Sequence, residues 1–199
     1  MPDPKPSLLA RIIKALILWL YRRKGWSEVN ANPDLRQCIV IAAPHTSNWD
    51  FVYFIGAAHA LGLPLSFVGK KSLFRWPFGR AMMALGGVPV DRSQSTNFVD
   101  AMIAEFAARD TFMLTIAPEG TRGAVKKWKT GFYHIAMGAG VPLVLGMMDY
   151  GKKRVGLAGA IMPTGDYAAD MAKIAAFYST TTPKYPQKGS VDFGTIEAR

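Results

Sequence analysis

Cysteine is nearly absent from this chain of 199 residues: Cys38 is the single one, so no disulfide can form within the chain. Cys38 lies inside the apolar run 38–43, where we expect its thiol to be buried and inert. Acidic residues are also scarce, 14 against 24 lysines and arginines, which gives a formal net charge of +10. This balance suggests a polyanionic partner: a nucleic acid, an anionic membrane surface or a phosphorylated substrate.

A long uncharged apolar run is missing as well. The best candidate, Leu8–Leu20, contains Arg11 and Lys14, so it is too short and too charged to cross a bilayer core unaided. No small-residue cleavage site follows it, which argues against a signal peptide. Its apolar and basic residues instead predict an amphipathic helix that lies on anionic lipid and ends at Gly25. Packing of the same helix on the protein's own core is the alternative.

Several functional signatures are also missing from the sequence. We find no internal repeat, no nucleic-acid-binding motif, no Gly-x-Ser-x-Gly elbow, and no His, Cys, Asp and Glu set with the spacing of a metal site. We therefore expect no metal and no cofactor. The positive charge alone does not choose among the three kinds of partner, and without a binding motif we expect no nucleic-acid partner.

Apolar runs that suit buried strands alternate with helical patterns along the chain. The strands are predicted at 38–43, 65–69, 88–90, 112–116, 141–148 and 155–161, and the helices at 49–61, 78–85, 98–108, 131–138 and 166–178. This order indicates an α/β fold, a single domain with a largely parallel central sheet flanked by helices. Pro89 argues for an edge or irregular position of the strand 88–90. We assign 1–30 to the N-terminal amphipathic helix and its connector, and 31–199 to the α/β domain.

His45 and Asp50 follow the predicted strand 38–43 directly, with four residues between them. A carboxylate that binds one ring nitrogen of a histidine fixes its tautomer, and the other nitrogen is then free to take a proton from a hydroxyl. The alternative for this pair is a structural hydrogen bond at a helix start, where Ser47 or Asn48 is the expected cap.

Three further segments carry polar residues near predicted strand ends. The stretch 86–92 ends in Arg92, whose guanidinium suits phosphate, although a surface ion pair is the alternative. The loop 117–122 follows the strand 112–116, and the basic stretch 126–131 leads into a helix. Because ligands of an open parallel sheet bind beyond the carboxyl ends of its strands, we expect the loop 117–122 to share a cleft with His45.

In this order, the four segments resemble the glycerolipid acyltransferase family, whose best-known members are the 1-acylglycerol-3-phosphate acyltransferases. The family carries His and Asp with four residues between them, a glycine-rich stretch ending in Arg, Pro-Glu-Gly-Thr-Arg, and later Val-Pro. The matching positions here are His45 with Asp50, Gly87–Arg92, Pro118–Arg122, the Lys129–Gly131 step and Val141–Val144. The resemblance covers about the central half of the chain.

The resemblance implies an acyltransferase of phospholipid biosynthesis or remodelling. His45 would be the general base and Asp50 its orienting partner. The substrate-binding residues would be Arg92, Glu119, Gly120, Thr121, Arg122 and Lys129, with the arginines on phosphate. Val141–Val144 would line or support the acyl region. The donor would be acyl-CoA or acyl carrier protein, a co-substrate rather than a cofactor, and the acceptor the hydroxyl of a lysophospholipid-like molecule.

A thioester already contains a good leaving group, so direct attack by the acceptor is expected rather than an acyl-enzyme. Peripheral attachment to an anionic membrane surface, on the cytoplasmic face of a bacterial inner membrane, is the implied location. Two departures from the family pattern leave the acceptor open: Ala117 stands where an aromatic residue is usual, and Pro44 where Asn is common. A non-catalytic lipid- or phosphate-binding protein on the same fold is the alternative function.

Overall fold

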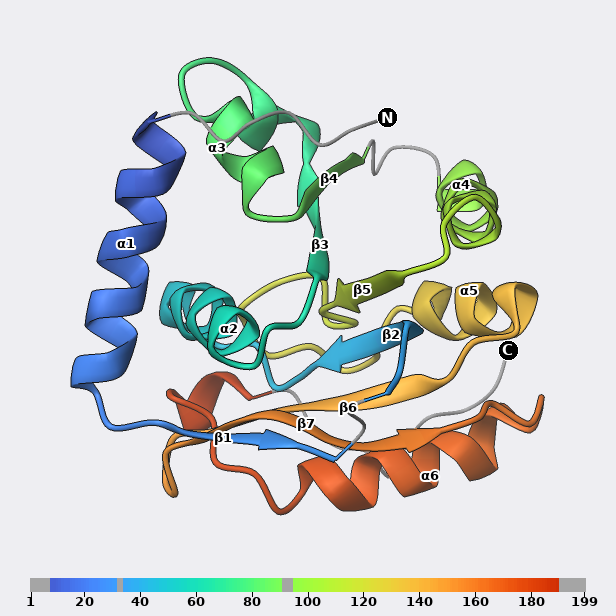
Figure 1. Ribbon diagram of the computed structural model, residues 1–199. Helices are drawn as coiled ribbons and strands as arrows, with labels where there is room; N and C mark the ends of the chain where they lie inside the picture. Colours follow the sequence, from blue (N-terminus) through green and yellow to red (C-terminus); the bar gives the residue numbers. More distant parts are fainter. Residues whose placement is uncertain (1–7, 32–33, 91–94, 190–199) are drawn as a thin grey trace.

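A seven-stranded sheet forms the centre of the protein (Figure 1), in a computed structural model that describes residues 8–31, 34–90 and 95–189. The strand order is β1-β7-β6-β2-β5-β3-β4. The strands are β1 (Ser27–Asn30), β2 (Gln37–Ala42), β3 (Leu65–Lys70), β4 (Gly87–Val90), β5 (Phe112–Ile116), β6 (Leu143–Asp149) and β7 (Arg154–Ile161). Every apolar run predicted as a strand is present.

The central strands run parallel and are buried on both faces. Ile39 of β2 pairs with Leu114 of β5 on one side and with Leu143 of β6 on the other, and all three side chains are fully buried. Continuous apolar runs are typical of such strands, because neither face meets water. β7 is antiparallel to β6, and β1 is parallel to β7, so these two strands run against the others. The expected α/β class with a largely parallel sheet is confirmed.

Helices cover the sheet and its edges. They are α1 (Leu8–Arg23), α2 (Asn48–Ala60), α3 (Gly79–Ala84), α4 (Ser95–Ala107), α5 (Gly131–Ala139) and α6 (Tyr167–Tyr178), with short 3-10 turns η1 (Lys71–Phe74) and η2 (Pro186–Lys188). On one face of the sheet, Ile39 and Ile41 pack into a core that includes Phe132 of α5 and Ile174 of α6. Val40 faces the other side of the sheet, where Val40 and residues of α2 line one cavity.

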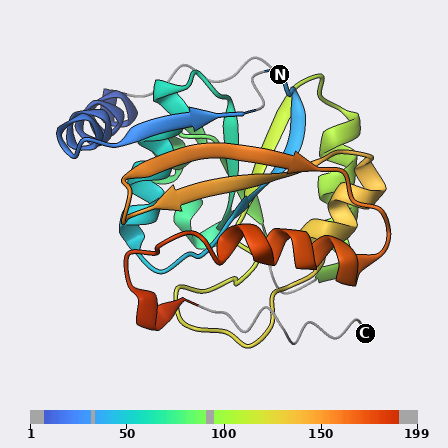
Figure 2. The same ribbon diagram turned by 90° about the horizontal axis from the view of Figure 1, so that it is seen from below.

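Helix α1 lies outside α2 at the edge of the molecule, as Figures 1 and 2 show. It buries only a narrow stripe, Ala10, Ile17 and Tyr21. The Tyr21 ring rests on Gly56 of α2, where a Cβ atom would lie 2.5 Å from the ring, so glycine is required at that position. The helix thus packs on the domain through one face. Within the described ranges, no helix is long and apolar enough to cross a membrane.

The two edges of the sheet differ in how well the sequence predicts them. β4 is an edge strand, as Pro89 indicates. The opposite edge, β1, carries no apolar run and is missed by the pattern. It pairs with β7 at Gly156, where any Cβ would clash with the carbonyl oxygen of Val29. The close approach of this strand therefore depends on a glycine more than a hundred residues away.

Candidate active site

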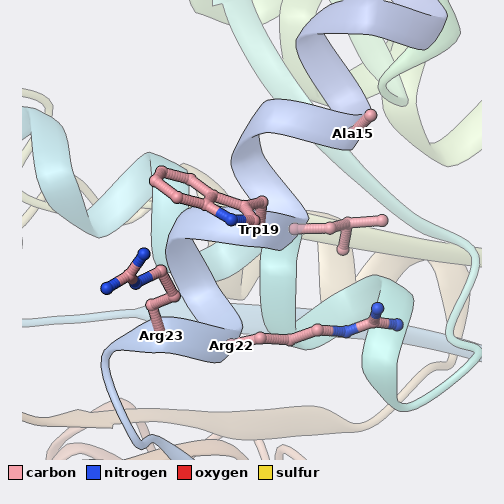
Figure 3. Close-up of a pocket in the computed structure, with 5 residues that line it drawn as sticks. Ala15, Trp19, Arg22 and Arg23 are labelled. Atoms are coloured by element: carbon pink, nitrogen blue, oxygen red, sulfur yellow. The ribbon is translucent and has the colours of Figure 1, made fainter.

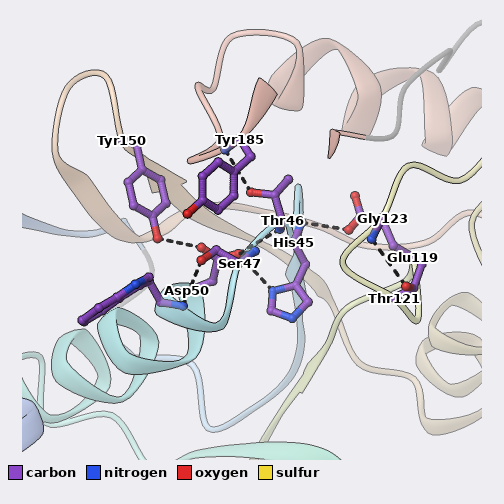
Figure 4. Close-up of polar contacts among 10 residues, drawn as sticks. His45, Thr46, Ser47, Asp50, Glu119, Thr121, Gly123, Tyr150 and Tyr185 are labelled. Atoms are coloured by element: carbon purple, nitrogen blue, oxygen red, sulfur yellow. Dashed lines mark hydrogen bonds and ion pairs between the residues drawn. The ribbon is translucent and has the colours of Figure 1, made fainter. Parts of the chain in front are cut away.

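His45 and Asp50 lie beyond the carboxyl end of β2, and their side chains meet (Figure 4). The distance from His45 Nδ1 to Asp50 Oδ2 is 3.2 Å. The imidazole retains 26% of its side-chain exposure, whereas the carboxylate retains 10%. With Nδ1 on the carboxylate, Nε2 is on the other side of the ring and can face a substrate.

Asp50 is held by more than its histidine. Its Oδ2 accepts hydrogen bonds from the amides of Thr46 and Ser47, each at 2.9 Å, and its Oδ1 accepts one from the Tyr150 hydroxyl at 2.6 Å. Burial alone would raise the pKa of Asp50, but the hydrogen bonds from His45, Tyr150 and Ser47 outweigh it and lower that pKa. Asp50 is therefore an ionised, fixed partner for the imidazole.

The same carboxylate closes the first turn of α2. Ser47 is the N-cap, and its hydroxyl accepts from the amide of Trp49, while Asp50 at the third helical position accepts from the Ser47 amide. This is a capping box. Ser47 and Asp50 thus cap α2, as the structural alternative expects, and the same Asp50 carboxylate contacts the His45 imidazole. Helix formation and imidazole placement depend on one side chain.

The loop after β5 reaches the same place. β5 is the parallel neighbour of β2, so the loop 117–122 leaves the sheet beside His45. Glu119 is 4% exposed, and its Oε2 accepts a 2.8 Å hydrogen bond from the amide of His45. The expected shared cleft is present, and Glu119 fixes the backbone of the histidine there.

Lys129 lies across the turn of this loop. Gly120 has a φ of 66°, a conformation that favours glycine, and a Cβ there would meet the Lys129 side chain at 3.0 Å. The amide of Lys129 also donates to the carbonyl of Pro118 at 2.9 Å. Two sequence segments with predicted binding roles are therefore brought together.

The remaining predicted binding residues are less constrained. Thr121 and Arg122 are exposed, and the Thr121 hydroxyl accepts a long 3.4 Å hydrogen bond from the amide of Gly123 in its own loop. Such side chains are free to turn toward a ligand. Arg92 lies outside the described residues.

An apolar cavity of about 190 Å³ begins at the pair. It lies between α2 and the sheet, and His45 and Asp50 line it together with mostly apolar side chains. Among these are Phe51, Phe54, Leu61, Leu65, Phe67 and Leu157. In β6, residues 146–148 line the cavity. The segment Val141–Val144 does not line it: its residues are buried, except for Pro142, which is partly buried.

The segment 182–185, which follows α6, also contacts residues of the site. The carbonyl of Thr182 accepts from the amide of Tyr150 at 2.8 Å, and the amide of Tyr185 donates to the Thr46 hydroxyl at 3.3 Å. The ammonium group of Lys184 lies 4.8 Å from the centre of the Trp49 ring. Residues 182–185 and Tyr150 were not among the sequence candidates, since no local pattern joins positions a hundred residues apart.

We predict that Tyr150→Phe lowers turnover several-fold and destabilises the fold by about 1 kcal/mol, because it removes one hydrogen bond to Asp50. Its matched control is Tyr133→Phe, since Tyr133 donates a 2.9 Å hydrogen bond to the buried Asp170, a residue of α6 outside this site. Both variants should melt earlier, but only Tyr150→Phe should lose turnover. Equal turnover in the two variants would remove Tyr150 from the supports of the site.

The chemistry that this arrangement allows is proton abstraction by a neutral imidazole whose partner carboxylate stabilises the resulting cation. Cys38 is fully buried on β2, and burial raises the pKa of its thiol to about 12, so it is not a nucleophile. Across the residues that the structure describes, no group of three or more His, Cys, Asp or Glu side chains could hold a metal ion.

Comparison with known proteins assigns the family. The Acyltransferase family model matches residues 27–145, and the chain belongs to this family. The 1-acyl-sn-glycerol-3-phosphate acyltransferase of Salmonella typhimurium is 33% identical over 112 residues, and that of Escherichia coli is 32% identical over the same length. Each match covers 53% of this chain but only 44% of the relative.

A solved structure shows the same fold. The crystal structure of PlsC, the 1-acyl-sn-glycerophosphate acyltransferase of Thermotoga maritima, matches with a TM-score of 0.54 and 18% identity. The match covers 87% of this chain and 76% of that one. That share of the chain is larger than the region 27–145 that the family model matches.

Proposed function

We propose that the protein transfers a fatty acyl group from a thioester, acyl-CoA or acyl carrier protein, to the hydroxyl of a lysophosphatidic acid-like acceptor. The observation that carries the proposal is the His45–Asp50 pair at the mouth of an apolar cavity, in a chain of the acyltransferase family. The relatives that bear the lysophosphatidate activity in their names support the choice of acceptor.

In the proposed reaction, His45 Nε2 takes the proton of the acceptor hydroxyl as its oxygen attacks the thioester carbonyl carbon. Asp50 on Nδ1 stabilises the imidazolium ion. The tetrahedral intermediate then collapses, the carbon–sulfur bond breaks, and the thiolate takes the proton back from His45. The products are an ester and a free thiol, with no acyl-enzyme. The inert state of Cys38 supports this direct route.

The apolar cavity is the proposed place of the fatty acyl chain, because its apolar lining adjoins the imidazole. The anionic head of the acceptor is assigned to Lys129 and Arg122 at the loop 117–122, with Thr121 as a hydroxyl donor. Arg92, outside the described residues, is assigned to the same role from the sequence motif alone. Glu119 and Gly120 shape that loop. Among the described residues, neither Lys129 nor Arg122 forms an ion pair with a carboxylate, which supports a ligand role.

We further propose that the exposed face of α1 attaches the protein to the cytoplasmic face of the bacterial inner membrane. The supporting observation is that Leu8, Ile12, Leu16 and Trp19 are exposed on this helix, next to Arg22 and Arg23 at its end.

The test is an acceptor screen with purified full-length protein. Free thiol is measured after mixing acyl-CoA or acyl carrier protein thioesters with a panel of lysolipids, and the products are identified by mass spectrometry. We expect stoichiometric thiol and acylated product with lysophosphatidic acid. Lipid binding without thiol release across the whole panel would favour the non-catalytic alternative.

A further inference from the structure

Positive charge is segregated in this protein. The stretches 8–24 and 51–90 contain nine of the 24 basic residues and none of the 14 acidic ones. The rest of the chain is close to balance, so these stretches account for almost the whole net charge of +10. They are distant in sequence, but α1 contacts both α2 and α3, and Figure 1 shows its N-terminal end beside α3. The charge therefore gathers around these three helices.

Exposed apolar side chains gather in the same two stretches. Of the twelve large hydrophobic residues that are exposed among the described residues, five are on α1 and four lie between residues 73 and 83. Figure 3 shows the α1 part, where Arg22 and Arg23 project to opposite sides beneath Trp19. The Arg23 guanidinium lies 5.1 Å from the centre of the Trp19 ring.

The second group lies on η1, α3 and the loop between them. Trp76 is 93% exposed, and Leu73, Phe78 and Met83 are exposed beside it. The basic residues of this segment, Lys70, Lys71, Arg75 and Arg80, are exposed as well. A tryptophan left in water among cations is typical of a surface that meets the lipid–water interface, where the indole enters the headgroup layer and the cations bind phosphates.

We propose that the segment 70–83 is a second membrane-contacting element, which docks on an anionic lipid bilayer together with the outer face of α1. This goes beyond the attachment proposed for α1 alone. Charge complementarity selects the bilayer, since these two stretches carry nine cations and no acidic residue, and cations near the surface attract anionic headgroups. A second copy of the chain would bring the same positive charge and be repelled.

The proposal is tested by co-sedimentation of the full chain with vesicles of phosphatidylglycerol and phosphatidylcholine. We expect Trp76→Ser to lower the partition coefficient roughly ten-fold, because it removes a large apolar side chain from the interface. The matched control is Met162→Ser, at an exposed methionine outside the two stretches. Vesicles of phosphatidylcholine alone should bind weakly. Equal partitioning of wild type and Trp76→Ser, or an equal loss in Met162→Ser, would overturn the proposal.

A labelling experiment separates direct contact from an indirect effect. Because Cys38 is fully buried, Trp76→Cys offers one reactive thiol for an environment-sensitive fluorophore, and Met162→Cys serves as the control. Anionic vesicles should blue-shift the emission at position 76 and leave that at 162 unchanged. If the emission at position 76 does not shift, the proposal is wrong. It is also wrong if the protein forms a dimer in solution, and Trp76→Ser dissociates that dimer but leaves vesicle binding unchanged.

An activity assay in detergent distinguishes the docking role of Trp76 from a role in the proposed acyl transfer. It measures the thiol released when thioester and acceptor are mixed without a bilayer. Trp76→Ser should turn over like wild type there, because position 76 is not among the residues that line the cavity. A loss of detergent activity in this variant would connect Trp76 to the active site and overturn its assignment as a docking residue. Vesicle binding with no turnover in any assay would refute the acyltransferase mechanism while leaving the docking surface supported.

Discussion

We expect that replacing His45 with alanine lowers the rate of the proposed acyl transfer by about a hundred- to ten-thousand-fold, the usual contribution of general-base catalysis. The acceptor hydroxyl then has no group beside it to receive its proton as it attacks the thioester. The measurement is thiol release at saturating thioester and acceptor, with circular dichroism and thermal melting to establish that the variant is folded.

His134→Ala is the matched control, because His134 is an exposed histidine on α5 and outside the cavity. It should retain wild-type turnover. Imidazole added to His45→Ala should restore part of the activity, since the small base can occupy the space left beside Asp50. Full activity of His45→Ala without imidazole would sink the proposed mechanism.

The second large effect is expected for Asp50→Asn, which should lower turnover by about a hundred-fold or more and cost roughly 1–3 kcal/mol of stability. A neutral amide cannot stabilise an imidazolium ion, and its single oxygen cannot serve the donors that share the carboxylate. Asp170→Asn is the matched control, because Asp170 is also buried and also accepts a tyrosine hydroxyl. It should lose stability and keep its turnover.

The pH dependence of unfolding gives an independent reading of Asp50. Its pKa is lowered in the folded protein from an ordinary value of 3.8, so its contribution to stability is present above that value. The contribution is lost as the pH falls through the lowered folded pKa. Urea unfolding between about pH 2 and 7 should show a steeper loss of stability below the ordinary pKa of 3.8 in wild type than in Asp50→Asn. Identical slopes would mean that Asp50 has no lowered pKa.

The sequence predicts those elements of the fold that are determined by their own residues. Buried parallel strands such as β2 and β5 are continuous apolar runs, and the edge position of β4 follows from Pro89. The sequence did not predict β1, because this strand has no apolar run. It pairs with β7 where Gly156 leaves room for the backbone of Val29. The reversed direction of β7 has no sign in the pattern, since strand direction is set by tertiary packing.

The site follows the same division. Only four residues lie between His45 and Asp50, so their spacing in the sequence predicts the contact. The parallel pairing of β2 and β5 predicts that the loop with Glu119 lies beside them. Tyr150 reaches Asp50 from the far end of β6, at a separation of a hundred residues. The segment 182–185 carries no motif at all. Contacts of this kind require the folded chain, because nothing in either segment specifies the other.

Because Asp50 binds both the first turn of α2 and the imidazole, the state of that turn reports whether His45 has its partner. The amides of Thr46 and Ser47 are bonded to the same carboxylate oxygen that faces the imidazole. When this turn frays, those two protons become exchangeable and the histidine loses its partner in the same event. If His45 is the proposed general base, the fraction of molecules with an intact His45–Asp50 pair can be measured from two amide exchange rates, with neither thioester nor lipid present.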